Sequence, residues 1–210
     1  MNDFIKPLWF EKFYKNWMEK ARGYDSLLDN SDIDIKLSSY FDKFFTLFVI
    51  YNALYVEATI LLKRRDNHQT DEYFDSIAAT DFVVKYLYAR NLYPGLEKKC
   101  HSEIETVKEI LEKRMFAIIL DQLTGEPCFE KDKKLLADLK DGSDQKCNAI
   151  LLIIYNVRCN MFHGRKSFES DQLMILTPVI KILETVIEIL YKKVSKDIGI
   201  PSLTRIKQPK

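Results

Sequence analysis

The chain has 210 residues, of which 47% are hydrophobic and 30% charged, and its formal net charge is +1. These values exclude a wholly disordered chain and allow one domain with a substantial core. The balanced charge also excludes an overall field that attracts nucleic acid, so any anion site must be local. Six glycines and six prolines leave few turns, which favours long helices over many short strands.

Four cysteines show no paired CxxC spacing, and no secretory signal pattern precedes them. We therefore expect a cytoplasmic protein whose reduced thiols pack as small hydrophobic groups. The longest apolar run, Thr46 to Leu62, is marginal in length for a membrane span and contains Asn52 and Glu57. A buried helix is expected there, with no membrane association.

Apolar residues recur at helical spacing in the first third of the chain. One predicted helix covers residues 7–21, and a second, rich in phenylalanine and tyrosine, covers about residues 36–63. The second helix carries two adjacent apolar stripes, which predicts a central position in a bundle. Asn52 lies in one stripe. If it is buried, its amide needs a partner, either on a neighbouring helix or in a functional site.

The middle of the chain alternates helical patterns with turn signals. Met115 and Ile118 fall on an apolar stripe, so we expect both to face the core. The predicted elements are a loop at 64–71, a helix at 72–90, a turn at Asn91–Gly95, a helix from a capping box at Ser102 and Glu105 to about Leu123, and a short peripheral helix at 130–140.

The last third predicts two long helices. Ser143 can cap the first, and Gly164 is placed to stop it. Ser167 or Ser170 restarts the chain. At Pro178 the last helix either kinks or begins anew, and we favour one kinked helix because the apolar repeat continues in register.

No stretch alternates at period two over a useful length. The sequence therefore predicts an all-α protein, an antiparallel helical bundle forming a single domain over residues 1–210. Residues 199–210 are expected to form a tail.

Metal binding is not expected, because His68, His101 and His163 lie far apart with no ligand spacing. The sequence has no glycine-rich phosphate loop and no nucleophile elbow. Cys159 could be a nucleophile near His163, but its place in an apolar-periodic helix favours a packed thiol.

The segment from Tyr155 to Lys166 places two arginines, a lysine and an imidazole at the end of an apolar helix. Arg158 and His163 are five residues apart, about 140° around an ideal helix. They converge only if the helix ends at His163 or if two copies meet across a two-fold axis. In the structural alternative, Arg158 pairs with an acid while His163, Arg165 and Lys166 stabilise the helix dipole.

The string Arg158-Cys159-Asn160-Met161-Phe162-His163-Gly164 is an Arg-x4-His pattern between an apolar helix and a long final helix. In this context it resembles the HEPN superfamily. Tyr51-Asn52-Ala53-Leu54-Tyr55 is similar to what members with this type of motif carry upstream. The resemblance covers about residues 36–63 and 143–195, with 64–142 as an elaboration.

This resemblance implies a four-helix core with additional helices and a metal-independent, cofactor-free endoribonuclease. Members act on RNA as homodimers in which the motif helices of two subunits meet. Many are toxins or defence effectors, often beside an antitoxin or another regulatory protein. By position, the implied catalytic pair is Arg158 and His163, the polar supports are Asn160 and Asn52, and the phosphate-gripping residues are Arg165 and Lys166.

The implied chemistry suits these residue types. When an RNA 2′-hydroxyl attacks the adjacent phosphate, His163 can accept a proton and Arg158 can stabilise the developing charge. Two positions depart from the family pattern. Cys159 replaces a commonly polar residue, and Arg165 replaces a tyrosine that is modified in some toxins, so that modification is not expected. The alternative function is a non-catalytic module that binds RNA, a nucleotide or a protein.

Overall fold

The computed structural model describes residues 7–66, 74–121, 123–162 and 169–200. In these ranges the chain forms helices joined by turns, with an isolated bridge between Leu120 and Pro127 and no strand. The predicted all-α class is therefore confirmed. The helices are α1 (Pro7–Gly23), α2 (Ile33–Asp66), α3 (Asp75–Ile77), α4 (Val83–Leu87), α5 (Ala89–Glu112), α6 (Phe129–Lys140), α7 (Ser143–Phe162) and α8 (Leu173–Asp197), with short turns η1 (Asp25–Leu27), η2 (Ala78–Phe82) and η3 (Ser170–Gln172).

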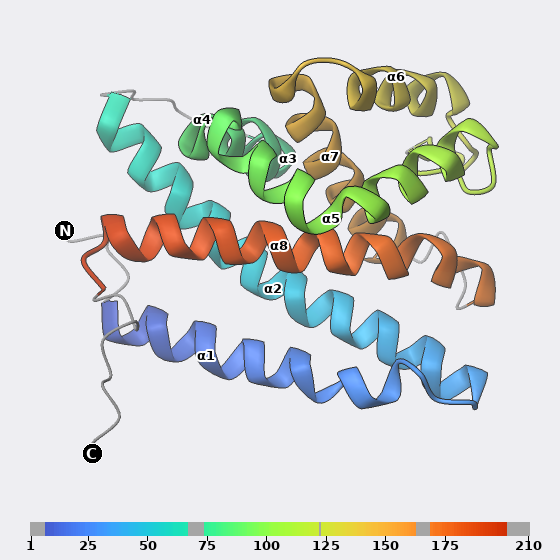
Figure 1. Ribbon diagram of the computed structural model, residues 1–210, viewed down its shortest axis with the longest axis horizontal. Helices are drawn as coiled ribbons and strands as arrows, with labels where there is room; N and C mark the ends of the chain where they lie inside the picture. Colours follow the sequence, from blue (N-terminus) through green and yellow to red (C-terminus); the bar gives the residue numbers. More distant parts are fainter. Residues whose placement is uncertain (1–6, 67–73, 122, 163–168, 201–210) are drawn as a thin grey trace.

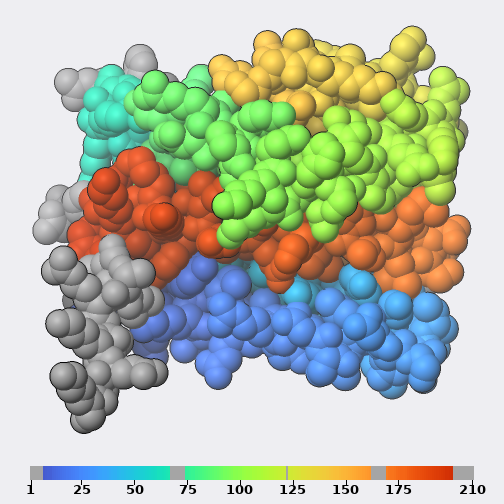
Figure 2. Space-filling model, in the orientation of Figure 1, coloured from blue at the N-terminus to red at the C-terminus, as the bar shows by residue number. Residues whose placement is uncertain are grey.

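Helix α8 runs through the middle of the molecule, with α1 on one side, α5 on the other and α2 crossing behind it (Figure 1). The space-filling view shows α8 as a band between α1 and α5 (Figure 2). Pro178 lies inside α8, so a single helix continues through it, as favoured. The packing of α5 along α8 places part of the 64–142 stretch in the core of the bundle.

Helix α2 buries one broad aromatic face, which includes Tyr51 and Tyr55, against the rest of the bundle. The middle of the second apolar stripe is not covered: Val49 and Val56 are 37% and 38% exposed, and Asn52 is exposed. Helix α2 packs against α8, α1 and the α3–α4 region, as a central position in the bundle requires, but these described neighbours leave the middle of the second stripe open.

By length and composition, α2 is the one helix of the described chain that could cross a membrane. In the structure, 61% of its most apolar window is buried. Its buried Lys43 forms ion pairs with Asp25 of η1 and, at 2.8 Å, with Glu184 of α8. Packing inside the bundle therefore accounts for the apolar composition of α2.

The helix predicted at 72–90 is present from Asp75 to Leu87, but its middle, Ala78–Phe82, is π-helical. The hydroxyl of Tyr51 donates a hydrogen bond to the carbonyl of Ala79 in this segment. The wider π turn changes the phase between the two ends of the helix. It therefore sets the direction in which Asp75 points.

The turn predicted at Asn91–Gly95 is wrong. The chain turns at Tyr88, whose φ of 60° is outside the helical region, and α5 begins at the next residue. Pro94 lies inside α5, beyond its first turn, so the helix forms there without the backbone hydrogen bond that an N–H at this position would donate. Gly95 serves close packing, since a Cβ there would lie 2.6 Å from Cδ1 of Ile189 on α8.

The helix predicted to end near Leu123 ends at Glu112 instead. Met115 is 50% exposed, so its predicted burial is wrong, whereas Ile118 is fully buried as expected. The carboxylate of Asp132 on α6 accepts hydrogen bonds from the backbone of Ile118 (3.1 Å) and Ile119 (2.9 Å). These distant contacts replace the helical hydrogen bonds that the local pattern predicts.

Candidate functional site

Two of the predicted site residues on α7, Arg158 and Asn160, lie in the last turns of this helix. The other three residues of the motif segment, His163, Arg165 and Lys166, lie outside the described residues. The convergence of Arg158 with His163 therefore stays a prediction. What the structure does describe is the surroundings of Arg158 and Asn160.

Arg158 is half-buried between α7 and α2. Its guanidinium carbon lies 5.4 Å from the ring centre of Phe48 and 5.9 Å from that of Tyr155. Its Nη1 also donates to Sγ of Cys159 at 3.8 Å. Cation–π contacts of this kind contribute about 0.5–2 kcal/mol each, so the two rings restrict where the guanidinium can lie.

Beside Arg158, one carboxylate joins three helices. The hydroxyl of Tyr55 on α2 donates to Oδ1 of Asp75 at 2.6 Å, and the hydroxyl of Tyr155 on α7 donates to Oδ2 at 3.1 Å. Asp75 is the first residue of α3. This network holds Tyr155 in place, and Tyr155 in turn forms one wall of the Arg158 site.

Both phenols remain protonated donors. Burial, followed by the hydrogen bond to Asp75, raises the pKa of Tyr55 far above its usual range. Burial is also the main cause that raises the pKa of Tyr155, with smaller contributions from Cys159 and Asp75, while Arg158 opposes the shift. Neither phenol is suited to be a general base near neutral pH.

Sequence reasoning did not identify Asp75, Tyr55 or Tyr155 as parts of this network. The available signal was the hydroxyl groups of tyrosines on an apolar helical face, because buried hydroxyls need hydrogen-bond partners. Nothing in the sequence could say that the shared partner is Asp75, which lies 20 residues from Tyr55 and 80 from Tyr155.

Asn160 was expected to support Arg158, but its side chain is buried on another side of α7. It is 6% exposed, and its Nδ2 donates to the carbonyl of Ile118 at 2.8 Å. Two residues along a helix are separated by about 200°, so Asn160 and Arg158 point to opposite sides of α7. With Asp132 holding the amide of Ile118, Asn160 anchors the end of α7 to the segment after α5.

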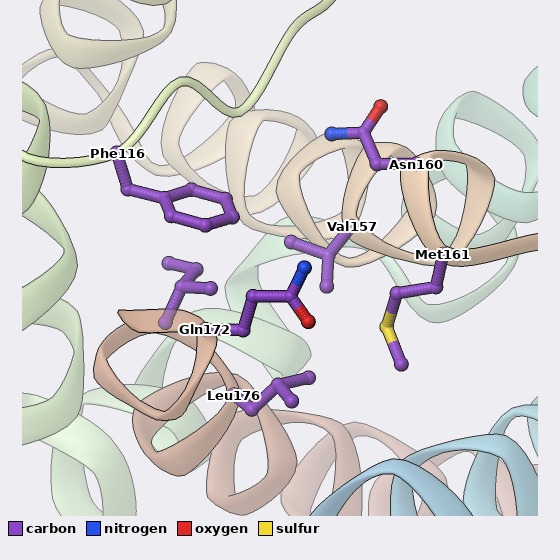
Figure 3. Close-up of a pocket in the computed structure, with 7 residues that line it drawn as sticks. Phe116, Val157, Asn160, Met161, Gln172 and Leu176 are labelled. Carbon is purple, nitrogen blue, oxygen red and sulfur yellow. The ribbon is translucent and has the colours of Figure 1, made fainter. Parts of the chain in front are cut away.

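A small cavity lies next to this anchor (Figure 3). The side chain of Gln172, from the turn before α8, lies between Phe116 on one side and Val157 and Met161 of α7 on the other (Figure 3). The volume of the cavity is only about 10 Å³, on the order of what a single water molecule needs. It is a packed seam between the end of α7 and the start of α8, not a ligand site.

Asn52, the other predicted support, is exposed on α2 rather than buried. It lies between Val49 and Val56 on the uncovered stripe, so a buried hydrogen bond to a neighbouring helix is excluded as its role in this chain. A second molecule that covers the stripe could reach its amide.

Within the part of the chain that the structure describes, no three His, Cys, Asp or Glu side chains lie close enough to hold a metal ion. His101 lies on α5, where it is exposed and its Nδ1 is 2.8 Å from Oε1 of Glu97. All four cysteines, including Cys159, are free thiols.

No protein-family model matches the chain, and no curated protein or solved structure matches it either.

Proposed function

We propose that the protein is a metal-independent endoribonuclease of the HEPN type that acts as a homodimer. The observation that carries the proposal is the placement of Arg158 in the last turns of α7. There it lies against Phe48 and Tyr155, and the motif continues directly to His163. A guanidinium held in this way needs little reorganisation to stabilise charge that develops on a phosphate.

The proposed reaction is attack of an RNA 2′-hydroxyl on the adjacent phosphate. His163 accepts the proton of the hydroxyl, and Arg158 stabilises the pentacoordinate phosphorane through its fork of N–H donors. The 5′-oxygen leaves and takes a proton from water, and the products are a 2′,3′-cyclic phosphate and a 5′-hydroxyl end. Arg165 and Lys166 hold the neighbouring phosphates, which makes binding weaken as salt rises.

The exposed stripe of α2 supports the homodimer. Val49, Asn52 and Val56 lie along one face of α2, and Phe48, which contacts Arg158, precedes the stripe by one residue. A two-fold contact through this face would bury the two valines and give Asn52 a partner. It would also bring the two copies of Arg158 toward the same cleft.

The test is cleavage of a single-stranded RNA in EDTA by the wild type and by Arg158→Ala and His163→Ala. We expect each variant to lose at least about 10²-fold in single-turnover rate. His101→Ala is the matched control, because His101 is an exposed histidine on α5. Circular dichroism of each variant checks that it is folded.

Equal cleavage by wild type and both variants would refute the proposal. Wild-type protein that binds RNA without cutting it would instead identify the non-catalytic module, a function consistent with Cys159 at a position that is commonly polar in active members.

The proposal extends to a role as a toxin or defence effector restrained by an antitoxin. A stable complex with a neighbouring gene product, whose addition stops RNA cleavage in the assay above, is the expected result. Purification from the native host as a homodimer alone would count against this part of the proposal.

A further inference from the structure

A second cavity lies at the opposite end of α7 from Arg158. Its volume is about 520 Å³, within the usual range of about 300–1,000 Å³ for small-molecule sites. Three segments form it: the end of α2, the stretch from α4 through the Tyr88 turn, and the first residues of α7. Along α7, Ser143 and Arg158 are separated by roughly 22 Å at 1.5 Å per residue. The cavity is therefore separate from the Arg158 site.

Tyr88 is the central side chain of this cavity. Its φ of 60° turns the chain between α4 and α5 and leaves the residue 43% exposed. The guanidinium carbon of Arg65 lies 4.9 Å from the centre of its ring, and that of Arg90 lies 5.2 Å from it. One aromatic ring and two planar cations thus form a single cluster on the cavity wall.

The charges around the cluster favour an anion on the Arg90 side. Arg65 already donates two hydrogen bonds to Asp66, at 2.8 and 3.3 Å. Lys85 and Arg90 are exposed and also line the cavity, whose remaining acid is Asp144. The three cations exceed the two carboxylates by one charge. A negatively charged group of a ligand would therefore form its strongest hydrogen bonds beside Lys85 and Arg90.

If the cavity had only its cations, it could bind any anion, and if it had only the Tyr88 ring, it could bind any flat apolar ligand. Stacking surfaces and phosphate-binding cations within one cavity are the combination that holds a base together with its phosphate. We propose that this cavity binds a nucleotide, with the phosphate at Arg90 and Lys85 and the base against Tyr88 and the guanidinium of Arg65. The inference goes beyond RNA cleavage, because it holds whether or not Arg158 is catalytic.

Isothermal titration calorimetry of the full chain with three probes tests the ligand class. The probes are adenosine monophosphate, inorganic phosphate and adenosine. We expect the monophosphate to bind at least about tenfold more tightly than either of the others, a difference of about 1.4 kcal/mol. Phosphate binding as tightly as the monophosphate would overturn the proposal, since the base would then contribute nothing.

A short single-stranded RNA with a 5′-phosphate distinguishes the two sources of a nucleotide. Affinity equal to that of the monophosphate would support an RNA end as the natural ligand. Much weaker affinity would support a free nucleotide. Either result keeps the site, and the titration is run on Arg158→Ala to prevent cleavage.

Tyr88→Gly is the decisive variant, because glycine adopts a φ of 60° without strain and the turn is kept while the ring is removed. We expect this variant and Arg90→Gln each to weaken monophosphate binding about tenfold with little change in melting temperature. Arg22→Gln, an exposed arginine on α1, is the control. Unchanged affinity in both Tyr88→Gly and Arg90→Gln would overturn the site.

Nucleotide binding at Tyr88 and RNA cleavage at Arg158 are tested separately by these variants. Arg158→Ala should bind the monophosphate as the wild type does, so loss of cleavage in that variant and loss of nucleotide binding in Tyr88→Gly identify separate failures.

Discussion

The two ends of α7 place cations in opposite kinds of surroundings. At the C-terminal end, Arg158 is half-buried between two aromatic rings. At the N-terminal end, Lys85 and Arg90 are exposed around an open cavity. A guanidinium restricted by packing is ready for charge that forms during a reaction, whereas exposed cations must be ordered by the ligand itself. The first arrangement suits catalysis and the second suits binding.

The largest expected effect separates these roles directly. Replacing Arg158 by lysine keeps the charge and removes the planar fork, so we expect a loss in cleavage rate close to that of Arg158→Ala, at least about 10²-fold. Single-turnover cleavage in EDTA measures it. Monophosphate affinity should stay at the wild-type value. If Arg158→Lys cleaved at the wild-type rate, the rigid geometry at this end of α7 would have no catalytic role.

The next effect concerns what holds the Arg158 end in place. Asn160→Ala leaves the buried carbonyl of Ile118 without its side-chain donor, so we expect a loss of about 1–3 kcal/mol in the free energy of unfolding. Urea denaturation measures it. Asn156→Ala is the matched control, since the amide of Asn156 donates to the carbonyl of Leu152 in the same helix. Equal losses in the two variants would show that the Ile118 contact adds nothing specific.

A smaller effect is expected from Asp75→Asn. The substitution replaces one carboxylate oxygen by an NH2 group, so only one of the two phenols keeps its acceptor. The remaining hydrogen bond also loses the negative charge of its acceptor. We therefore expect the free energy of unfolding to fall by about 1 kcal/mol. The cleavage rate should fall as well, because Tyr155 is less firmly placed beside Arg158. Asp171→Asn, at an exposed position, is the control for both measurements. An unchanged rate would show that Asp75 serves the fold alone.

The last effect is a pH dependence at the other end of α7, which is absent at neutral pH. Burial raises the pKa of the Cys147 thiol from 9.0 to about 12. The unfolded chain releases this proton above pH 9 while the folded chain keeps it, so stability falls as pH rises from 9 toward 12. A difference of one bound proton between the folded and unfolded chains lowers the free energy of unfolding by at most about 1.4 kcal/mol per pH unit.

Cys147→Ala should therefore flatten the loss of stability in urea titrations between pH 8 and 10. Cys128→Ala is the control, since Cys128 is only half-buried. A slope that stays the same in Cys147→Ala would show that other groups cause the alkaline loss.

The long helices were predictable because their apolar periodicity is local and dense. The stripes of α2 and α8 predict both helices to within a few residues, and the repeat across Pro178 predicts that α8 continues. The failures occurred where distant residues decide the structure. Pro94 and Gly95 are strong turn signals, yet the turn lies at Tyr88, and the backbone after Glu112 follows Asp132 and Asn160 instead of its own pattern.

The candidate site divides in the same way. The motif from Arg158 onward can be recognised because its residues are adjacent in sequence. Asp75 and the Tyr88 cavity cannot, because each is assembled from three segments that only the fold brings together. The exposure of Asn52 was not predictable either, because helical spacing alone does not tell whether another helix will cover a stripe.

The π-helical turn at Ala78–Phe82 has a consequence for how insertions and deletions act on this protein. Deleting one residue there would let the turn become a regular α-helix and leave Val83 and the rest of α4 in place. A π turn winds more residues into one turn than an α turn does, so α3 would keep nearly the same rotation about the helix axis relative to α4. Asp75 would then stay close to the two tyrosine hydroxyls. The π turn is thus a place where the loss of a single residue leaves the wall beside Arg158 anchored.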